Sequence, residues 1–278
     1  MNQIAEQEVV KRDLRRIMEI YRTTEGTIRP HFILTGPSGS GKTHTIQTLC
    51  AEFGLNFFEI NAAQLTKEGT SGNSLSKALA PIGQRPGLGI CFIDEFDKLF
   101  ISGNQNSELA HETTNGVQNE FLKVLESRNT SVFGDYGKYV DIKIDHILFI
   151  FAGAFNGQEN LSLDELRSFG IKTEFLGRVG LIYNLEKLSI NSMYAALQNS
   201  ELFNHYLRLF PEVDRKQAEA DIMGAVQKNF ENNTLGIRLL TNLMHQYFIK
   251  GGLTETVVNT TTFQTTLSFK PDPVGQIV

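Results

Sequence analysis

The sequence predicts an α/β domain with a parallel sheet flanked by helices, followed by a smaller, mainly helical domain. Two observations carry this prediction. Up to about residue 186, short apolar runs alternate with helical patterns, which is typical of parallel sheets with helical crossovers. Beyond that point helical patterns dominate, so we place the domains at 1–186 and 187–278.

The elements of the large domain follow from their periodicity. Residues 5–22 have apolar positions at helical spacing and a charged opposite face. Helical patterns return farther along the chain, at 43–53, 74–79 and 115–127. Largely apolar runs that end in polar turns predict buried strands at 31–35, 56–61, 89–94, 146–152 and 181–185.

The small domain is expected to contain three helices and a short tail. The helical patterns cover 192–203, 214–229 and 236–249. The last stretch, 254–278, is rich in threonine with alternating polarity. It predicts one strand followed by a loose end that contains Pro271 and Pro273.

The composition is that of a soluble globular protein. Of 278 residues, 41% are hydrophobic and 21% are charged, which excludes a disordered or fibrous chain. The net charge of −5 argues against a surface that is basic throughout and coats nucleic acid. Cys50 and Cys91 lie in apolar stretches without metal-ligand spacing, so we expect buried, reduced thiols. The polar start and the short longest apolar run, 147–155, lead us to expect a cytoplasmic protein without membrane contact.

The first chemical motif is the octapeptide GPSGSGKT, from Gly36 to Thr43, which matches G-x-x-x-x-G-K-[ST] in full. In this motif backbone N–H groups surround phosphate oxygens, the lysine adds positive charge and the hydroxyl of the last residue reaches Mg²⁺. An expected strand precedes it and an expected helix follows, which disfavours a glycine-rich surface turn. The expected nucleotide-binding residues of this segment are Pro37, Ser38, Gly39, Ser40, Gly41, Lys42, Thr43 and His44.

The second motif is the apolar run ICFI followed by Asp94 and Glu95. Ligands of open α/β sheets bind at the carboxyl ends of the strands, where Asp94 would lie. Asp94 and Thr43 are therefore the candidate Mg²⁺ ligands, and Glu95 is the candidate base that polarises water. Such a strand end alone is more often a solvated turn, but a phosphate loop upstream in the same chain favours the catalytic interpretation. Asp97 has no assigned chemical role; we expect its carboxylate to start a helix or to pack against the protein.

Phosphoryl transfer needs additional positive charge, and two arginines are placed to supply it. Arg178 follows the sequence EFLG and precedes the last expected strand. Arg238 opens the last expected helix. Each is also consistent with a surface arginine whose stem packs against the protein.

The order of the motifs resembles that of the AAA+ unfoldases of the Clp/Hsl group, of the ClpX and HslU type. The matching segments span residues 4 to 240: IAEQE at 4–8, the phosphate loop, FIDEFDKL at 92–99, GVQ at 116–118, FLKVLE at 121–126, DHILFI at 145–150, GAF at 153–155, EFLGR at 174–178 and GIR at 236–238. The phosphate loop is generic. The GVQ and DHILFI…GAF segments are much more specific to this branch.

The resemblance implies a P-loop AAA+ module with a helical lid, assembled into a homo-hexamer with ATP and Mg²⁺ at the subunit interfaces. Ile4 and Ala5 would line the adenine pocket. Arg178 would be the finger that reaches a neighbouring subunit's site, and Arg238 the lid arginine that senses the γ-phosphate. With Lys42 and Glu95, these arginines are the expected catalytic residues.

The sequence also departs from the family pattern. The pore loop that carries an aromatic residue in the family corresponds here to Gly69–Gly72, where Thr70 and Ser71 stand. A segment with three aromatic residues, 132–139, occupies the place of a second pore loop, with Tyr136 as its candidate contact; a β-hairpin whose aromatics pack on the sheet fits equally well. The family's zinc-binding and peptidase-docking additions are not found, and Ala152 takes the place of a polar sensor.

Three functions fit these features. The first is an AAA+ ATPase that remodels or unfolds protein partners without an attached protease. The second is an ATP-controlled assembly switch or a nucleic-acid-associated ring, which the Thr70-Ser71 loop favours and the net acidity disfavours. The third is a catalytically silent ATP-binding subunit, against which the intact Lys42, Asp94 and Glu95 argue.

Overall fold

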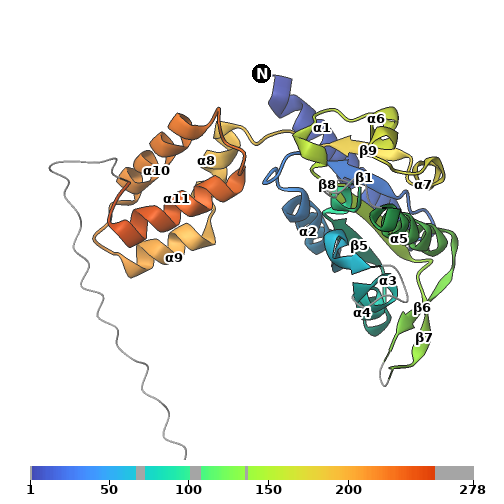
Figure 1. Cartoon of the computed structure of the whole chain (residues 1–278). Coiled ribbons are helices and arrows are strands. Elements are labelled where there is room, and N and C mark those ends of the chain that lie inside the picture. The colour runs from blue at the N-terminus through green and yellow to red at the C-terminus, as the bar shows by residue number, and fades with distance from the viewer. Residues whose placement is uncertain (1, 67–72, 101–107, 135–136, 254–278) are drawn as a thin grey trace, which may run out of the picture. The chain divides into compact units, whose positions relative to one another are not determined.

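The computed structural model describes residues 2–66, 73–100, 108–134 and 137–253, without the side chains of residues 2–7 and 108–114. The chain divides into two compact units, Met1–Lys187 and Leu188–Val278 (Figure 1). Across the described ranges, no helix combines the length and apolar character needed to cross a membrane.

The large unit is built on a five-stranded sheet whose hydrogen-bonded strands are all parallel. Its strand order is β2-β5-β8-β1-β9. The strands are β1 (Phe32–Thr35), β2 (Asn56–Asn61), β5 (Gly89–Asp94), β8 (Ile147–Gly153) and β9 (Leu181–Asn184). The α/β fold with a parallel sheet is therefore confirmed, and all five strands end at the same edge.

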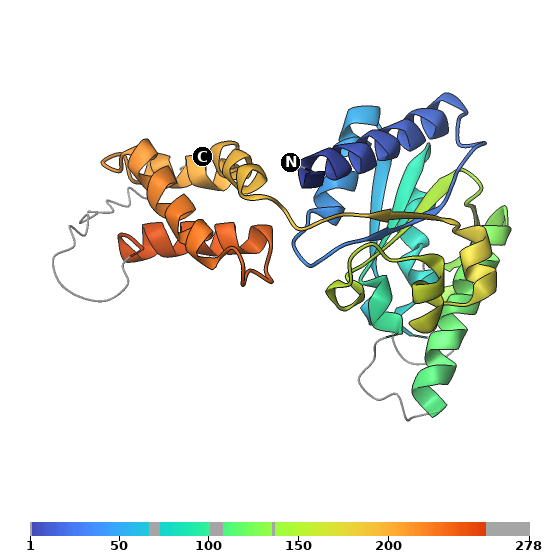
Figure 2. The ribbon, with the colours of Figure 1, turned by 90° about the horizontal axis from the view of Figure 1, so that it is seen from above.

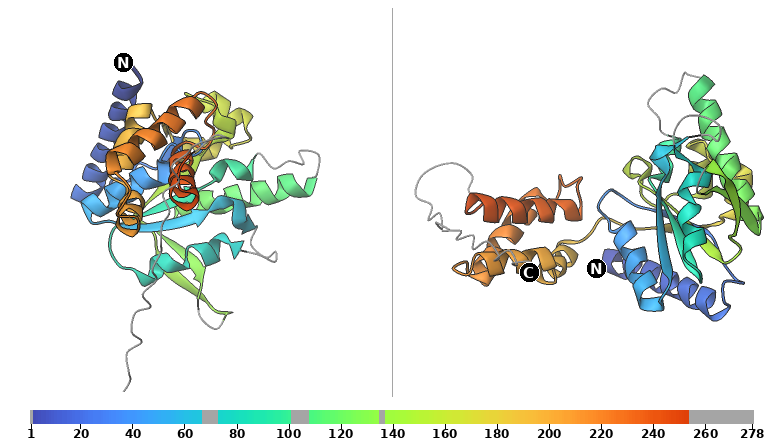
Figure 3. Two further views of the ribbon diagram at one scale, coloured as in Figure 1. Left: turned by 90° about the vertical axis from the view of Figure 1, so that its left-hand side faces the viewer. Right: turned by 90° about the horizontal axis from the view of Figure 1, so that it is seen from below.

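Helices cover both faces of this sheet (Figure 2). One face packs against α1 (Asn2–Thr23) and α2 (Lys42–Phe53). The other packs against the remaining helices of the unit, and Figure 3 (right) shows the sheet between the two layers. These are α3 (Leu75–Ala78), α4 (Ala80–Gln84), α5 (Glu108–Glu126), α6 (Leu163–Ser168) and α7 (Thr173–Arg178).

Strand β8 shows why the sheet needs two layers. All seven of its residues are buried, because alternate side chains enter opposite cores. Phe149 and Phe151 belong to the core under α5, whereas Leu148 and Ile150 belong to the core under α1 and α2. A continuous apolar run is the sequence signature of a strand covered on both faces.

The amino end of the sheet contains a titratable ring, that of His31. His31, just before β1, accepts a hydrogen bond at Nδ1 from the Phe149 N–H at 3.0 Å. Burial and the positive charge of Arg29 lower the pKa of His31 to about 4. The ring is thus a neutral acceptor that joins two neighbouring strands.

Among the described residues, two small two-stranded sheets lie outside the main sheet. The first pairs β3 (Leu65–Thr66) with β4 (Asn73–Ser74). The second is an antiparallel hairpin of β6 (Asn129–Phe133) and β7 (Tyr139–Lys143), which projects from the unit (Figures 1 and 3). The hairpin form fits the sequence, but Phe133 packs edge-on against Tyr139, which is 55% exposed, and not on the main sheet.

Up to residue 253, where the described part of the second unit ends, four helices surround its own core: α8 (Ile190–Gln198), α9 (Glu201–Leu209), α10 (Arg215–Asn229) and α11 (Ile237–Lys250). The expectation of one helix over 192–203 was wrong. The Ser200 hydroxyl accepts a hydrogen bond from the Phe203 N–H and so begins a new helix. The expected strand after residue 254 lies outside the described residues.

Candidate nucleotide site

The loop between β1 and α2 has the backbone of a phosphate cradle. Gly36, Gly39 and Gly41 have φ angles of 145°, 71° and 89°, a region that side chains with a Cβ rarely adopt. A Cβ on Gly36 would lie 2.5 Å from the Leu185 carbonyl oxygen, whereas one on Gly41 would meet nothing within 4 Å. The loop is therefore closely packed at Gly36, where it leaves β1, and open at Gly41, where α2 begins.

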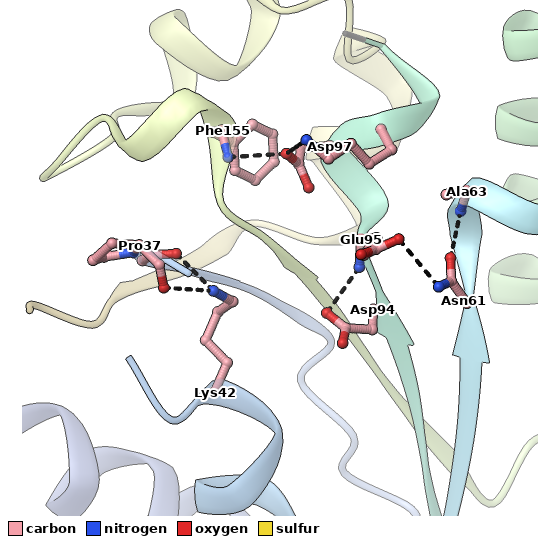
Figure 4. Close-up of polar contacts among 10 residues, drawn as sticks. Pro37, Lys42, Asn61, Ala63, Asp94, Glu95, Asp97 and Phe155 are labelled. Atoms are coloured by element: carbon pink, nitrogen blue, oxygen red, sulfur yellow. Dashed lines mark hydrogen bonds and ion pairs between the residues drawn. The ribbon is translucent and has the colours of Figure 1, made fainter. Parts of the chain in front are cut away.

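Lys42 and Ser40 fit a phosphate ligand in this loop. The Lys42 Nζ donates hydrogen bonds to the carbonyl oxygens of Gly36 at 2.6 Å and Pro37 at 3.1 Å (Figure 4). The Ser40 Oγ is buried, and no hydrogen bond satisfies it within the described part of the chain. A buried hydroxyl without a partner is costly, and a phosphate oxygen would satisfy it. Thr43 and His44 follow in the first turn of α2, whose positive dipole end faces the loop.

Asp94 and Glu95 lie at the carboxyl end of β5, the edge of the sheet at which ligands of open α/β folds bind. Asp94 Oδ1 accepts a hydrogen bond from the Glu95 N–H at 2.8 Å. Glu95 has a φ of 55°, an uncommon backbone conformation for a non-glycine residue. Its carboxylate accepts a hydrogen bond at Oε2 from Asn61 Nδ2 at 3.1 Å (Figure 4). The strained turn and the Asn61 amide together fix the direction of the Glu95 side chain.

The surroundings of Asp94 favour a cation. Glu59 lies on the neighbouring strand β2, and partial burial and the Asp94 charge raise the pKa of Glu59. Negative charge thus accumulates at this edge of the sheet. Among the described residues no group of three His, Cys, Asp or Glu is arranged to hold a metal ion by itself. Thr43 and Asp94 can hold Mg²⁺ if phosphate and water oxygens supply the other ligands, which is the usual Mg²⁺ coordination.

Asp97 has a structural position beside this edge. It is 1% exposed, and its Oδ2 accepts a hydrogen bond from the Phe155 N–H at 3.2 Å (Figure 4). A Cβ on Gly153 would lie 2.8 Å from Asp97 Oδ1 and 2.8 Å from Phe155 Cε2. Glycine at 153 therefore allows Asp97 to hold the turn after β8, which agrees with the packing role expected for this carboxylate.

The two arginines lie in different units. Arg178 ends α7, and its Nη2 lies 2.9 Å from Glu126 Oε1 at the end of α5. Arg238 lies in the first turn of α11 and is exposed. The turn before it is held by Asn233, whose Oδ1 accepts hydrogen bonds from the N–H groups of Leu235 and Gly236.

Several expected site residues fall beyond what the structure describes. The side chains of Ile4 and Ala5 lie outside the described residues, as do Thr70, Ser71 and Tyr136. Ala152, in the expected sensor place, is fully buried in β8.

Two residues that support the site, Asn61 and Asn184, are not among those predicted from the sequence. Asn61 ends β2, and its backbone lies opposite Asp94 in the sheet register. Because ligands bind at the carboxyl ends of parallel strands, a search for polar residues at every strand end would have identified it. Asn184 ends β9; its Oδ1 accepts hydrogen bonds from Thr35 Oγ1 and from the Leu161 N–H. Thr35 is the last residue before the phosphate loop, so Asn184 ties the root of that loop to the last strand.

Known proteins resemble this chain in sequence. Residues 32–169 match the ATPase family associated with various cellular activities (AAA) and form an AAA ATPase domain. The chain is similar to the protein named "ATP-dependent Clp protease ATP-binding subunit ClpX" of Borrelia duttonii, with 26% identity over 264 residues. It is also similar to the proteins of this name in Porphyromonas gingivalis, with 27% identity over 208 residues, and Bacteroides thetaiotaomicron, with 26% over 227 residues.

These alignments cover 78%, 59% and 66% of this chain, in the same order. They span 61%, 51% and 55% of the three relatives, so the chain corresponds to only part of their length. The chain thus contains a ClpX-like AAA+ ATPase module, and the resemblance of its motif order is confirmed.

Proposed function

We propose that this chain hydrolyses Mg·ATP in a homo-hexameric ring and uses the energy to remodel or unfold a protein partner. The observation that carries the proposal is the convergence of Lys42, Asp94 and Glu95 on one edge of the sheet. The ClpX-like motif order supports the ring and the protein partner. A cytoplasmic location remains a prediction from the sequence.

In the proposed site the loop from Pro37 to Gly41 binds the phosphates of ATP through backbone N–H groups, and the Ser40 hydroxyl adds a donor. The Lys42 amine exchanges the carbonyl oxygens of Gly36 and Pro37 for the β- and γ-phosphates. Thr43 and Asp94 hold Mg²⁺, which neutralises negative charge on the phosphates. Ile4 and Ala5 are proposed to contact the adenine.

Glu95 is proposed to orient the attacking water and to accept its proton, and Asn61 keeps the carboxylate in place. The additional positive charge for the transition state comes from Arg178 of a neighbouring subunit and from Arg238 of the second unit. Thr70, Ser71 and Tyr136 are the candidate pore contacts to the partner.

Light scattering behind a sizing column tests the assembly. The Glu95→Gln variant should bind ATP without turnover, so Mg·ATP is expected to shift its mass from 31.1 kDa to about six times that value. A monomer at every nucleotide concentration would contradict the ring.

Stimulation of the ATPase tests the partner. An unfolded protein should raise turnover, and single-stranded DNA should not. Stimulation by DNA that falls steeply with salt would instead support the nucleic-acid-associated ring.

A further inference from the structure

Helix α7, which carries Arg178, is too short to be stable without tertiary contacts. It has six residues, and its N-cap, Lys172, makes no side-chain capping hydrogen bond. Isolated helices of this length are unstable, so tertiary contacts must fix it. One such contact is Phe175, which is fully buried and stacks on Phe96 with ring centroids 5.2 Å apart.

Gln118 of α5 fixes the entrance of α7 from the other side. Its side chain is fully buried. Its Nε2 donates to the Gly170 carbonyl oxygen at 3.1 Å, and its Oε1 accepts from the Lys172 N–H at 3.0 Å. Both ends of the amide are thus used on the backbone directly before α7, and removing it would leave these two backbone groups without that partner.

Glu126, at the end of the same helix, contacts the other end of α7. Its carboxylate pairs with Arg178 at 2.9 Å, and both side chains are about half exposed. A carboxylate at a helix C-terminus is unfavourable because that end carries partial negative charge. The Arg178 guanidinium offsets this cost. Helix α5 therefore touches both the start of α7 and the arginine at its end.

We propose that Gln118 and Glu126 are positioning residues for Arg178. Gln118 fixes the position of α7, the helix from which the Arg178 side chain extends. Glu126 holds the guanidinium on its own subunit until the phosphate of a neighbour's nucleotide competes for it. The proposal rests on the proposed function, in which Arg178 acts on the ATP of a neighbouring subunit.

The two residues should have opposite effects. Loss of the Gln118 amide lets α7 shift, and a misplacement of about 1 Å costs on the order of 100-fold in rate. Loss of the Glu126 charge removes a competitor for the guanidinium. Because exposed ion pairs are weak, the resulting increase in the rate of ATP turnover should be small, roughly two- to fivefold.

Mixed rings of the full chain test this proposal. Glu95→Gln subunits act as arginine donors, since they cannot hydrolyse ATP themselves. Arg178→Ala subunits act as acceptors, since they retain Glu95 but supply no arginine. Turnover by the mixture therefore reports on Arg178 of the donor alone.

Gln118→Met, which keeps the side-chain length, is introduced first into the donor and then into the acceptor. We expect turnover to fall roughly 10- to 100-fold when the donor carries it and to stay within twofold when the acceptor carries it. Asn119→Ala is the matched control: this neighbour on α5 is exposed, and its Oδ1 accepts a hydrogen bond from the Lys172 side chain, so the substitution should be neutral in either subunit. Equal losses from Gln118→Met in both subunits would mean a general folding role and would overturn the proposal.

Glu126→Gln in the donor provides the second arm and does not threaten folding. At a fixed ratio of donor to acceptor, turnover should rise roughly two- to fivefold. An unchanged or lower turnover would overturn the role of Glu126. If the parent mixture shows no turnover at all, the action of Arg178 on a neighbour fails, and this inference fails with it.

Discussion

At the scale of single residues, the nucleotide site depends on a few side chains whose positions have separate causes. Lys42 is placed by the turn of three glycines with positive φ, and Glu95 by a strained backbone and the Asn61 amide. Asp97 lies beside them but serves the turn after β8. Substitutions should therefore separate nucleotide binding from hydrolysis.

Lys42→Ala should weaken ATP binding. The amine is the positive side chain of the phosphate loop, and a hydrogen bond to a charged group contributes about 1.5–3 kcal/mol, which is roughly 10- to 150-fold in Kd. Titration with a fluorescent ATP analogue measures this. Lys98→Ala, on the segment after Asp97, is the control and should bind normally. An unchanged Kd for Lys42→Ala would remove the phosphate loop from the site.

Glu95→Gln should leave the Kd for ATP within about threefold but lower kcat by roughly 100- to 10,000-fold, the usual contribution of a general base. Glutamine keeps the shape of the side chain and an oxygen for the Asn61 amide, but it cannot accept the proton. Phosphate release at saturating ATP measures kcat. Turnover near the wild-type rate would show that another group activates the water.

His31 should make the large unit acid-sensitive. Its folded pKa of about 4 lies below the ordinary value of 6.5, so the unfolded chain binds the extra proton first. Stability is therefore complete above pH 6.5 and falls as the pH drops toward 4, by up to roughly 3 kcal/mol. Denaturant unfolding at pH 7.5 and pH 5 measures this loss.

His31→Asn is the comparison, because asparagine does not titrate and its Oδ1 can accept the Phe149 N–H. The variant should lose less stability than the wild type between the two pH values. Equal losses would place the acid sensitivity elsewhere.

At the scale of elements, close approaches decide which glycines tolerate a side chain. Gly153→Ala should destabilise the large unit by about 1–3 kcal/mol, because its Cβ would overlap Asp97 and Phe155 at the end of β8. Gly177→Ala in α7 is the control: a Cβ there meets nothing within 4 Å, and alanine favours the helix. Thermal unfolding compares the two. A Gly153→Ala protein as stable as Gly177→Ala would contradict the packing at this edge.

The five strands of the sheet could be read from the sequence because each is a compact apolar run. The pairing of β1 with β8 and β9 could not, since residues far apart in the chain form it. The break between α8 and α9 was missed because the apolar positions continue across it, and only the Ser200 cap marks it. The hairpin at β6 and β7 was foreseen only as one of two alternatives, because aromatic residues fit either a packed face or an exposed one.

The residues of the sequence motifs were easier to predict than the residues that hold them in place. Lys42, Asp94 and Glu95 stand in recognisable order along the chain, whereas Asn61, Gln118 and Asn184 act through tertiary contacts. A polar residue at a strand end is a usable signal, which identifies Asn61 in retrospect. A buried glutamine within a helix gives no such signal until its partners are known.

At the scale of the whole molecule, one subunit supplies the phosphate loop and the carboxylates, while Arg178 is held by Glu126 on the same chain. In the proposed ring this arginine completes the site of a neighbouring subunit. Each subunit would then be both an ATPase and an activator, and hydrolysis would depend on assembly. The proposed function depends on this shared site.

Mixing Glu95→Gln and Arg178→Ala subunits in equal amounts tests this claim most directly. Each variant alone should be nearly inactive. In randomly mixed rings about a quarter of the sites pair an intact Glu95 with a neighbour's Arg178, so roughly a quarter of the wild-type ATPase rate should return. If the mixture is no more active than the average of the two variants alone, Arg178 does not act on a neighbouring subunit and the site is not shared between subunits.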